Sequence, residues 1–215
     1  MASSNHSTSE DSDIILSLPN SIVVRRYRAA DATSLSNHGN NIKIWNQLRN
    51  RMPYPYTKDA AQFWIEYCSS PEQFRASGPW TPDTGAQGPF VPTNFTIAVN
   101  GQACGSIGLD FGDPVDVYFR SAEVGYWLGE DYWGKGVMGA VVPAFVDWTW
   151  QMFGILIRLN AEVASQNLGS FRCLQRAGFV EEGRKKCAFV KNGVILDEIL
   201  LGMLRPGTME MEVDS

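Results

Sequence analysis

Histidine and cysteine are scarce in this sequence, and neither forms a cluster. The 215 residues include only two histidines, His6 and His38, and four cysteines with no CxxC pair and no histidine nearby. Structural zinc sites need such ligands at close spacing, so we expect no metal. We likewise expect structural thiols and no histidine-based catalysis.

Long apolar runs and basic clusters are also missing. No stretch approaches the roughly 20 apolar residues that cross a bilayer, and the serine-rich residues 1–13 lack a signal-peptide core. The net charge is -5, and dispersed lysines and arginines leave no basic footprint for nucleic acid or an anionic membrane. We therefore expect a cytoplasmic monomer or homodimer that binds neither nucleic acid nor a membrane. The net negative charge would suit cationic amines as partners.

Two common nucleotide-binding motifs do not occur. There is no GxxxxGK[ST] loop, and GKGVMG at residues 134–139 lies in the wrong strand order for a GxGxxG dinucleotide fold. Instead, an alternating run at 123–129 leads into this glycine-spaced turn and then into an apolar helix from Val137. Gly134 and Gly136 let backbone N–H groups converge, and a helix N-terminus carries unbonded donors and partial positive charge. The segment predicts a diphosphate-binding turn.

The rest of the pattern predicts one domain of α/β (α+β) class. Strands are expected at residues 21–28, 95–99, 103–109, 115–128, 158–164, 184–190 and 195–204. Helices are expected after a cap at Asp31, at 42–49, from 137 and at 167–178, and Asn192-Gly193 predicts a hairpin turn. The domain should span 21–205, with a flexible tail at 1–20, an acidic tail at 206–215 and an irregular Pro- and Gly-rich loop at 70–93.

Several segments occur in the order seen in one family. They are residues 52–64 (MPYPYTKDAAQFW), 122–136 (AEVGYWLGEDYWGKG), 167–170 (NLGS), 177–179 (AGF) and 197–204 (DEILLGML). Over about residues 20–205 the chain resembles GNAT-superfamily N-acetyltransferases, within them the RimJ and RimL branch of ribosomal-protein N-terminal acetyltransferases. The resemblance implies a GNAT fold, a mixed and strongly twisted sheet with helices on both faces. The strands ending near Leu128 and Ala164 should splay apart around acetyl-CoA.

The resemblance further implies acetyl-CoA as cosubstrate and no metal. The expected binding residues are Tyr126, Trp127, Leu128, Trp133, Gly134, Lys135, Gly136, Val137, Met138, Gly139, Asn167 and Ser170. Met138 departs from the family pattern [QR]xxGx[GA] at its last position. Pro143 should kink or loosen the following helix because it lacks an N–H group.

Acetyl transfer needs a neutral amine, so a base should lie near the thioester. An α-amino group is partly neutral at pH 7, whereas a lysine is almost fully protonated. Glu123 is the candidate base, and a solvated acid at a strand start is the alternative. By resemblance, Ser170 protonates the leaving thiolate and N–H groups near Trp127 and Leu128 bind the oxyanion. Helix capping alone also explains Asn167 and Ser170.

The resemblance implies an acceptor wall that includes Tyr54, Tyr56 and Trp64, although these aromatic residues could equally be core. Glu123 and Asp197, or Glu198 beside it, could orient the acceptor amine; an acid facing water is the alternative for the hairpin residues. Three functions stay open. They are acetylation of a protein or peptide N-terminus, acetylation of a small amine such as a polyamine, amino sugar or antibiotic, and CoA binding without catalysis.

Overall fold

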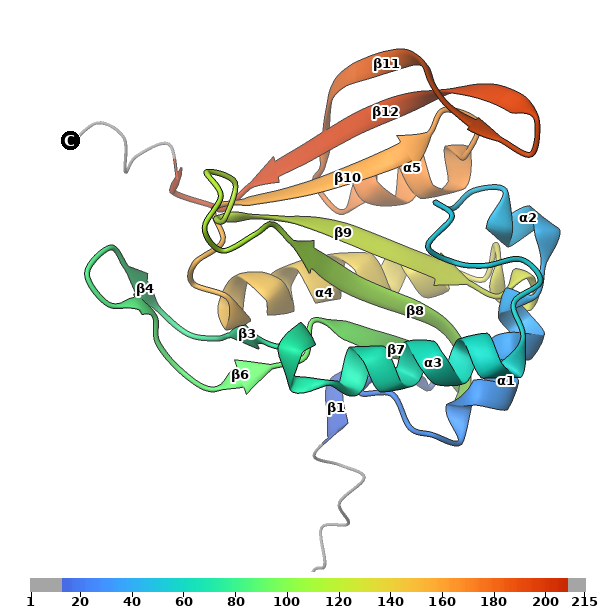
Figure 1. Ribbon diagram of the computed structural model, residues 1–215, viewed down its shortest axis with the longest axis horizontal. Helices are drawn as coiled ribbons and strands as arrows, with labels where there is room; N and C mark the ends of the chain where they lie inside the picture. The colour runs from blue at the N-terminus through green and yellow to red at the C-terminus, as the bar shows by residue number, and fades with distance from the viewer. Residues whose placement is uncertain (1–12, 209–215) are drawn as a thin grey trace, which may run out of the picture.

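The computed structural model describes residues 13–208, which form an eight-stranded sheet with helices on both faces (Figure 1). In spatial order the strands are β1 (Ile14–Leu18), β2 (Ile22–Arg25), β7 (Asn94–Val99), β8 (Gln102–Phe111), β9 (Ser121–Leu128), β10 (Arg158–Ala164), β12 (Val194–Leu204) and β11 (Val180–Lys191). Neighbouring strands are antiparallel except β9 and β10, which are parallel. The expected mixed sheet is confirmed.

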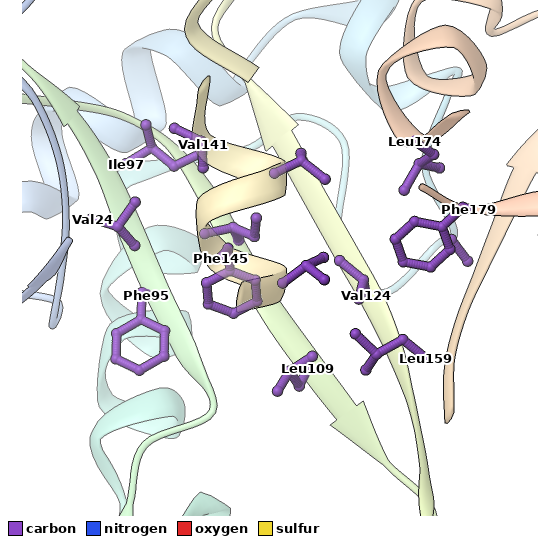
Figure 2. Packing of buried hydrophobic residues seen from close by; sticks show 14 of the residues in the cluster. Val24, Phe95, Ile97, Leu109, Val124, Val141, Phe145, Leu159, Leu174 and Phe179 are labelled. Carbon is purple, nitrogen blue, oxygen red and sulfur yellow. The ribbon is translucent and has the colours of Figure 1, made fainter. Parts of the chain in front are cut away.

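The helices divide between the two faces of this sheet. One face carries α1 (Asp31–Gly39) and α3 (Lys58–Ser69), linked through the short α2 (Ile42–Trp45), and the other carries α4 (Val137–Met152) and α5 (Leu168–Arg176) (Figure 1). Figure 2 shows the main core, where Val141 and Phe145 of α4 lie among apolar side chains of the sheet. A smaller cluster that includes Leu35 and Ile65 lies under α1 and α3. No helix among residues 13–208 is long and apolar enough to span a bilayer.

The parallel strands β9 and β10 are paired only where they begin. Their register runs from Arg158↔Ser121 to Asn160↔Glu123 and then stops. In contrast, β10 stays paired with β12 as far as Ala164↔Glu198. The backbone of residues 124–128 therefore has no partner on its β10 side, and the two strands part as the resemblance implies.

The expected tails and loop differ from the structure in part. Residues 14–18, expected in a flexible tail, form β1, because Asn20 and Ser21 adopt positive φ and reverse the chain onto β2. Residues 1–12 and 209–215 of the two expected tails lie outside the described residues. The loop at 70–93 is not wholly irregular, since backbone pairing organises it. It holds a 3-10 turn (Pro71–Gln73) and two short ladders, β3 (Arg75–Ala76) with β6 (Phe90–Val91) and β4 (Trp80–Thr81) with β5 (Gly85–Ala86).

Other boundaries also shift. Strand β9 begins later than expected, since turns occupy residues 112–120, while β11 begins earlier and α2 is shorter. Asp31 is the first residue of α1 rather than its cap, and its carboxylate pairs with the buried Arg25 at 2.7 Å. Helix α4 continues past Pro143 to Met152, because its buried face packs in the main core. The hairpin turn is confirmed, with positive φ at Asn192 and Gly193.

Candidate active site

One cavity of about 1450 Å³ extends from the parted ends of β9 and β10 to the sheet face beneath α3. The residues predicted for the cosubstrate that line it are Tyr126, Trp127, Leu128, Trp133, Gly134, Gly136, Val137, Met138, Gly139, Asn167 and Ser170. Glu123, Tyr56 and Trp64 line it as well. Among the described residues predicted for the site, Lys135, Tyr54, Asp197 and Glu198 are not part of the lining.

At one end of the cavity lies the start of α4. Gly134 and Gly136 have φ of 70° and 79°, and a Cβ on either would meet no atom within 4 Å. The first N–H bonded within the helix is that of Ala140, which donates to the Gly136 carbonyl at 3.1 Å. The N–H groups of residues 137–139 precede that bond and have no acceptor within the helix. This open turn, with the positive end of the helix dipole behind it, fits a diphosphate group.

Ser170 presents its hydroxyl to the cavity from the first turn of α5. Asn167 caps this helix, and its side-chain oxygen accepts the Ser170 N–H at 3.1 Å. The Ser170 hydroxyl is left to share a hydrogen bond with the Tyr126 hydroxyl at 2.8 Å. Burial raises the pKa of Tyr126 well above its ordinary value, so the phenol keeps its proton. Asn167 therefore caps α5, and both Asn167 and Ser170 also line the cavity.

Glu123 lies at the last register pair before β9 and β10 part. Its Oε2 accepts a hydrogen bond from Arg49 Nη1 at 3.1 Å, and Arg49 also binds Glu162 on β10. Burial raises the pKa of Glu123, Arg49 opposes that rise, and the nearby Glu162 and Asp110 carboxylates reinforce it. The net direction is upward, which favours proton exchange close to neutral pH.

The predicted acceptor residues are separated by the fold. Trp64 lines the cavity and donates from Nε1 to the Tyr27 hydroxyl at 3.2 Å. Tyr56 is only 4% exposed and belongs to the smaller core, and burial raises its pKa to about 12. Tyr54 packs against Trp45 instead, with ring centroids 5.5 Å apart.

The hairpin acids also have different surroundings. Asp197 accepts hydrogen bonds from Lys186 Nζ at 2.7 Å and from the Cys187 N–H at 2.9 Å, which hold its pKa below the ordinary value. Both donors belong to the β11–β12 hairpin, so the Asp197 carboxylate is held within this hairpin. Glu198 pairs with Lys185 at 3.0 Å, and Lys185 also approaches Glu162, so Glu198 belongs to the charge network beside the cavity.

Sequence reasoning missed the residues that surround Glu123. Arg49, Arg51, Asp110 and Glu162 all line the cavity. Arg49 meets its two partners across 74 and 113 positions of sequence, so no local pattern could join them. A two-residue period on β9 and β10 could have placed Glu123 and Glu162 on the same face of the sheet.

Known proteins resemble this chain in sequence and in fold. The profile of the acetyltransferase (GNAT) domain matches residues 21–180. “Probable N-acetyltransferase YjcK” of Bacillus subtilis (strain 168) is 38% identical over 87 residues, 40% of this chain and 48% of that protein. “Putative ribosomal N-acetyltransferase YdaF” of the same strain is 30% identical over 109 residues, 51% of this chain and 57% of that protein. The chain thus spans about half the length of these curated relatives.

Among solved structures, Mycobacterium smegmatis RimJ in complex with CoA-disulfide is similar to this chain with a TM-score of 0.66. The similarity covers 90% of this chain and 84% of that one, at 18% identity. At this identity the likeness shows the fold alone.

Proposed function

This chain belongs to the acetyltransferase (GNAT) domain family, and from that premise we propose that it transfers an acetyl group from acetyl-CoA to a primary amine. The observation that carries the proposal is the single cavity that joins the anion-binding start of α4 to the Glu123 carboxylate. A cosubstrate with a diphosphate fits one end, and an amine to be deprotonated fits the other. The cytoplasm, where acetyl-CoA is available, is the proposed location.

In the proposed reaction both substrates are bound together and the amine attacks the thioester directly. Glu123 accepts a proton from the ammonium group, and the freed nitrogen lone pair forms a bond to the carbonyl carbon. Backbone N–H groups along the unpaired end of β9, around Trp127 and Leu128, stabilise the oxyanion. The carbon–sulfur bond then breaks and Ser170 gives the thiolate its proton. The remaining excess proton of the nitrogen passes through water to the Ser170 oxygen, and Glu123 releases its proton to solvent.

Tyr126 and Asn167 position Ser170 in this scheme. The cap by Asn167 fixes the first turn of α5, and the Tyr126 hydroxyl orients the Ser170 hydroxyl through the hydrogen bond that they share. Gly134, Gly136 and the N–H groups of residues 137–139 hold the diphosphate. Trp133 supports this turn, since its Nε1 donates to the Leu128 carbonyl at 2.8 Å.

The acceptor we favour is a protein or peptide N-terminus. The name of YdaF supports this class, and an α-amino group is easier to deprotonate than a lysine side chain. A small amine is the second candidate, because the Glu123 end of the cavity is acidic and needs only a cationic group. A protein that binds CoA without catalysis is the third, given the unusual Met138 and Pro143.

The test is free-thiol release from acetyl-CoA with two panels, one of N-terminal peptides and one of small amines. We expect turnover in the peptide panel, and turnover in the amine panel alone would replace the favoured acceptor class. Acetyl-CoA binding by calorimetry with no release in either panel would support the silent binder. Absence of acetyl-CoA binding would overturn the proposed diphosphate site.

A further inference from the structure

Two facing glycines form the floor of the cavity beneath α3. Gly108 of β8 pairs with Gly125 of β9, between the pairs Ser106↔Trp127 and Asp110↔Glu123. All six residues line the cavity, on the sheet face that carries α3. At Gly125 this stretch of sheet presents backbone to a bound molecule, whereas the Asn94 side chain covers Gly108, where an added Cβ would meet its Oδ1 atom. A Cβ on Gly125 would meet no atom within 4 Å, so the space above it is open.

Aromatic side chains of α3 form the wall opposite this floor. Phe63, Trp64 and Tyr67 line the cavity, and Tyr67 stacks with both of the others at centroid distances of 6.4 and 5.5 Å. Phe63 is 69% exposed, an unusual position for a large apolar ring. A slot with a backbone floor and an aromatic wall suits a slim apolar stem and has little room for branching.

At the acidic end of the slot one cation is shared by two carboxylates. Arg49, from the connection between α2 and α3, bonds to Glu123 on β9 and to Glu162 on β10. Its side chain is 53% exposed, so solvent screens each pair and the guanidinium group can be exchanged for another cation. The same connection contributes the Gln47 side-chain oxygen, which is buried and has no hydrogen-bond partner among the described residues.

We propose that the Arg49 guanidinium holds, in the free protein, the place of the acceptor's ammonium group between Glu123 and Glu162. The acceptor is then a primary ammonium on a slim, unbranched stem that lies over Gly125, where the space above the sheet is open. This inference rests on the proposed function and adds a specificity-determining residue to it. Acetylation removes the acceptor's charge, so the carboxylates return to Arg49 and the neutral amide leaves.

The test measures amine binding by calorimetry to protein saturated with CoA, which has no acetyl group to transfer. The probes are 1-aminobutane, 1,4-diaminobutane and the tripeptide Gly-Gly-Gly, with the branched 2-aminobutane and Val-Gly-Gly for comparison. We expect the first three to bind, and the branched probes to bind about tenfold more weakly or worse. The diamine and peptide arms distinguish a small amine from a peptide N-terminus as the source of the ammonium group.

Arg49→Gln should tighten binding of the unbranched probes by roughly three- to tenfold, because the competing cation is gone. The matched control is Arg184→Gln, which removes one positive charge from an exposed pair with Glu181 outside the cavity lining. It should leave amine affinity unchanged. Gly125→Val, which the open space and ordinary φ of this strand position accommodate, should weaken amine binding and spare CoA binding.

Weaker or unchanged amine binding in Arg49→Gln would overturn the inference, and so would a failure of every unbranched probe to bind. These readouts do not depend on turnover. A protein that binds amines as described but releases no thiol from acetyl-CoA would leave the inference standing and count against the proposed function alone.

Discussion

Glu123 lies at the last register pair before β9 and β10 separate, and its side chain is largely covered. We expect Glu123→Gln to lower kcat about 100-fold or more, since an amide cannot accept the ammonium proton. Acetyl-CoA affinity, measured by calorimetry, should stay close to that of the wild type. The control is Glu181→Gln, which removes an exposed acid outside the cavity lining and should leave kcat unchanged.

The pH dependence of kcat/KM provides a second test of Glu123→Gln. Burial raises the pKa of Glu123 above its ordinary 4.5, and the carboxyl accepts a proton only when it is ionised, above that raised value. In the wild type kcat/KM should therefore decline as the pH falls through it, in addition to the titration of the amine itself. Glu123→Gln should show the amine's titration alone. Identical pH profiles for the two proteins would remove Glu123 as the base.

Single residues also show which parts of the site could be predicted from the sequence. Glu123, Asn167 and Ser170 could be named because each stands in a short motif with a recognisable role. Arg49 could not, because it lies 74 and 113 positions from its partners Glu123 and Glu162, and no local pattern joins residues so far apart. Asp197 was named for its place on the last strand, but it is not part of the cavity lining, and hydrogen bonds from Lys186 and Cys187 hold its carboxylate within the hairpin.

At the scale of elements, the start of α4 tests the placement of the diphosphate. Gly136 has a φ of 79°, which asparagine tolerates far better than most residues. Gly136→Asn and Gly136→Asp are therefore matched in size and differ in charge. We expect Asp to weaken acetyl-CoA binding at least about tenfold relative to Asn, or about 1.4 kcal/mol, because its carboxylate opposes the diphosphate.

The comparison is made by calorimetry at one salt concentration, since screening weakens the repulsion as salt increases. Far-UV circular dichroism checks that both variants are folded. Equal affinities for Asn and Asp would mean that the diphosphate binds elsewhere.

The elements that could be predicted are those whose signals are local. Strand β10 agrees with the expected 158–164, and the Asn192-Gly193 turn needs only two residues that tolerate positive φ. Strand β1 was missed because its short apolar run gains meaning only through pairing with β2. The ladders within 70–93 have two residues on each side, and such pairing leaves no periodic signal in a sequence.

At the scale of the whole molecule, the sheet separates two layers of unequal strength. The core on the α4 and α5 side contains 24 buried apolar residues, and the cluster on the α1 and α3 side contains 6. Burial of apolar surface is the main source of stability, so α3 is held less firmly than α4. The layer that covers the proposed acceptor slot is thus the one that can open most easily, while the start of α4 stays fixed.

Hydrogen exchange followed by mass spectrometry tests this division. We expect amides of α3 to exchange through local opening at a lower free energy than those of α4. Acetyl-CoA should slow exchange at the starts of α4 and α5 and leave α3 nearly unchanged. Addition of CoA and an unbranched amine together should slow α3 as well, because the slot beneath it is then filled.

Equal exchange of α3 and α4 in the free protein would contradict the unequal layers. Protection of α3 by acetyl-CoA alone would instead mean that the cosubstrate, rather than the acceptor, orders this face.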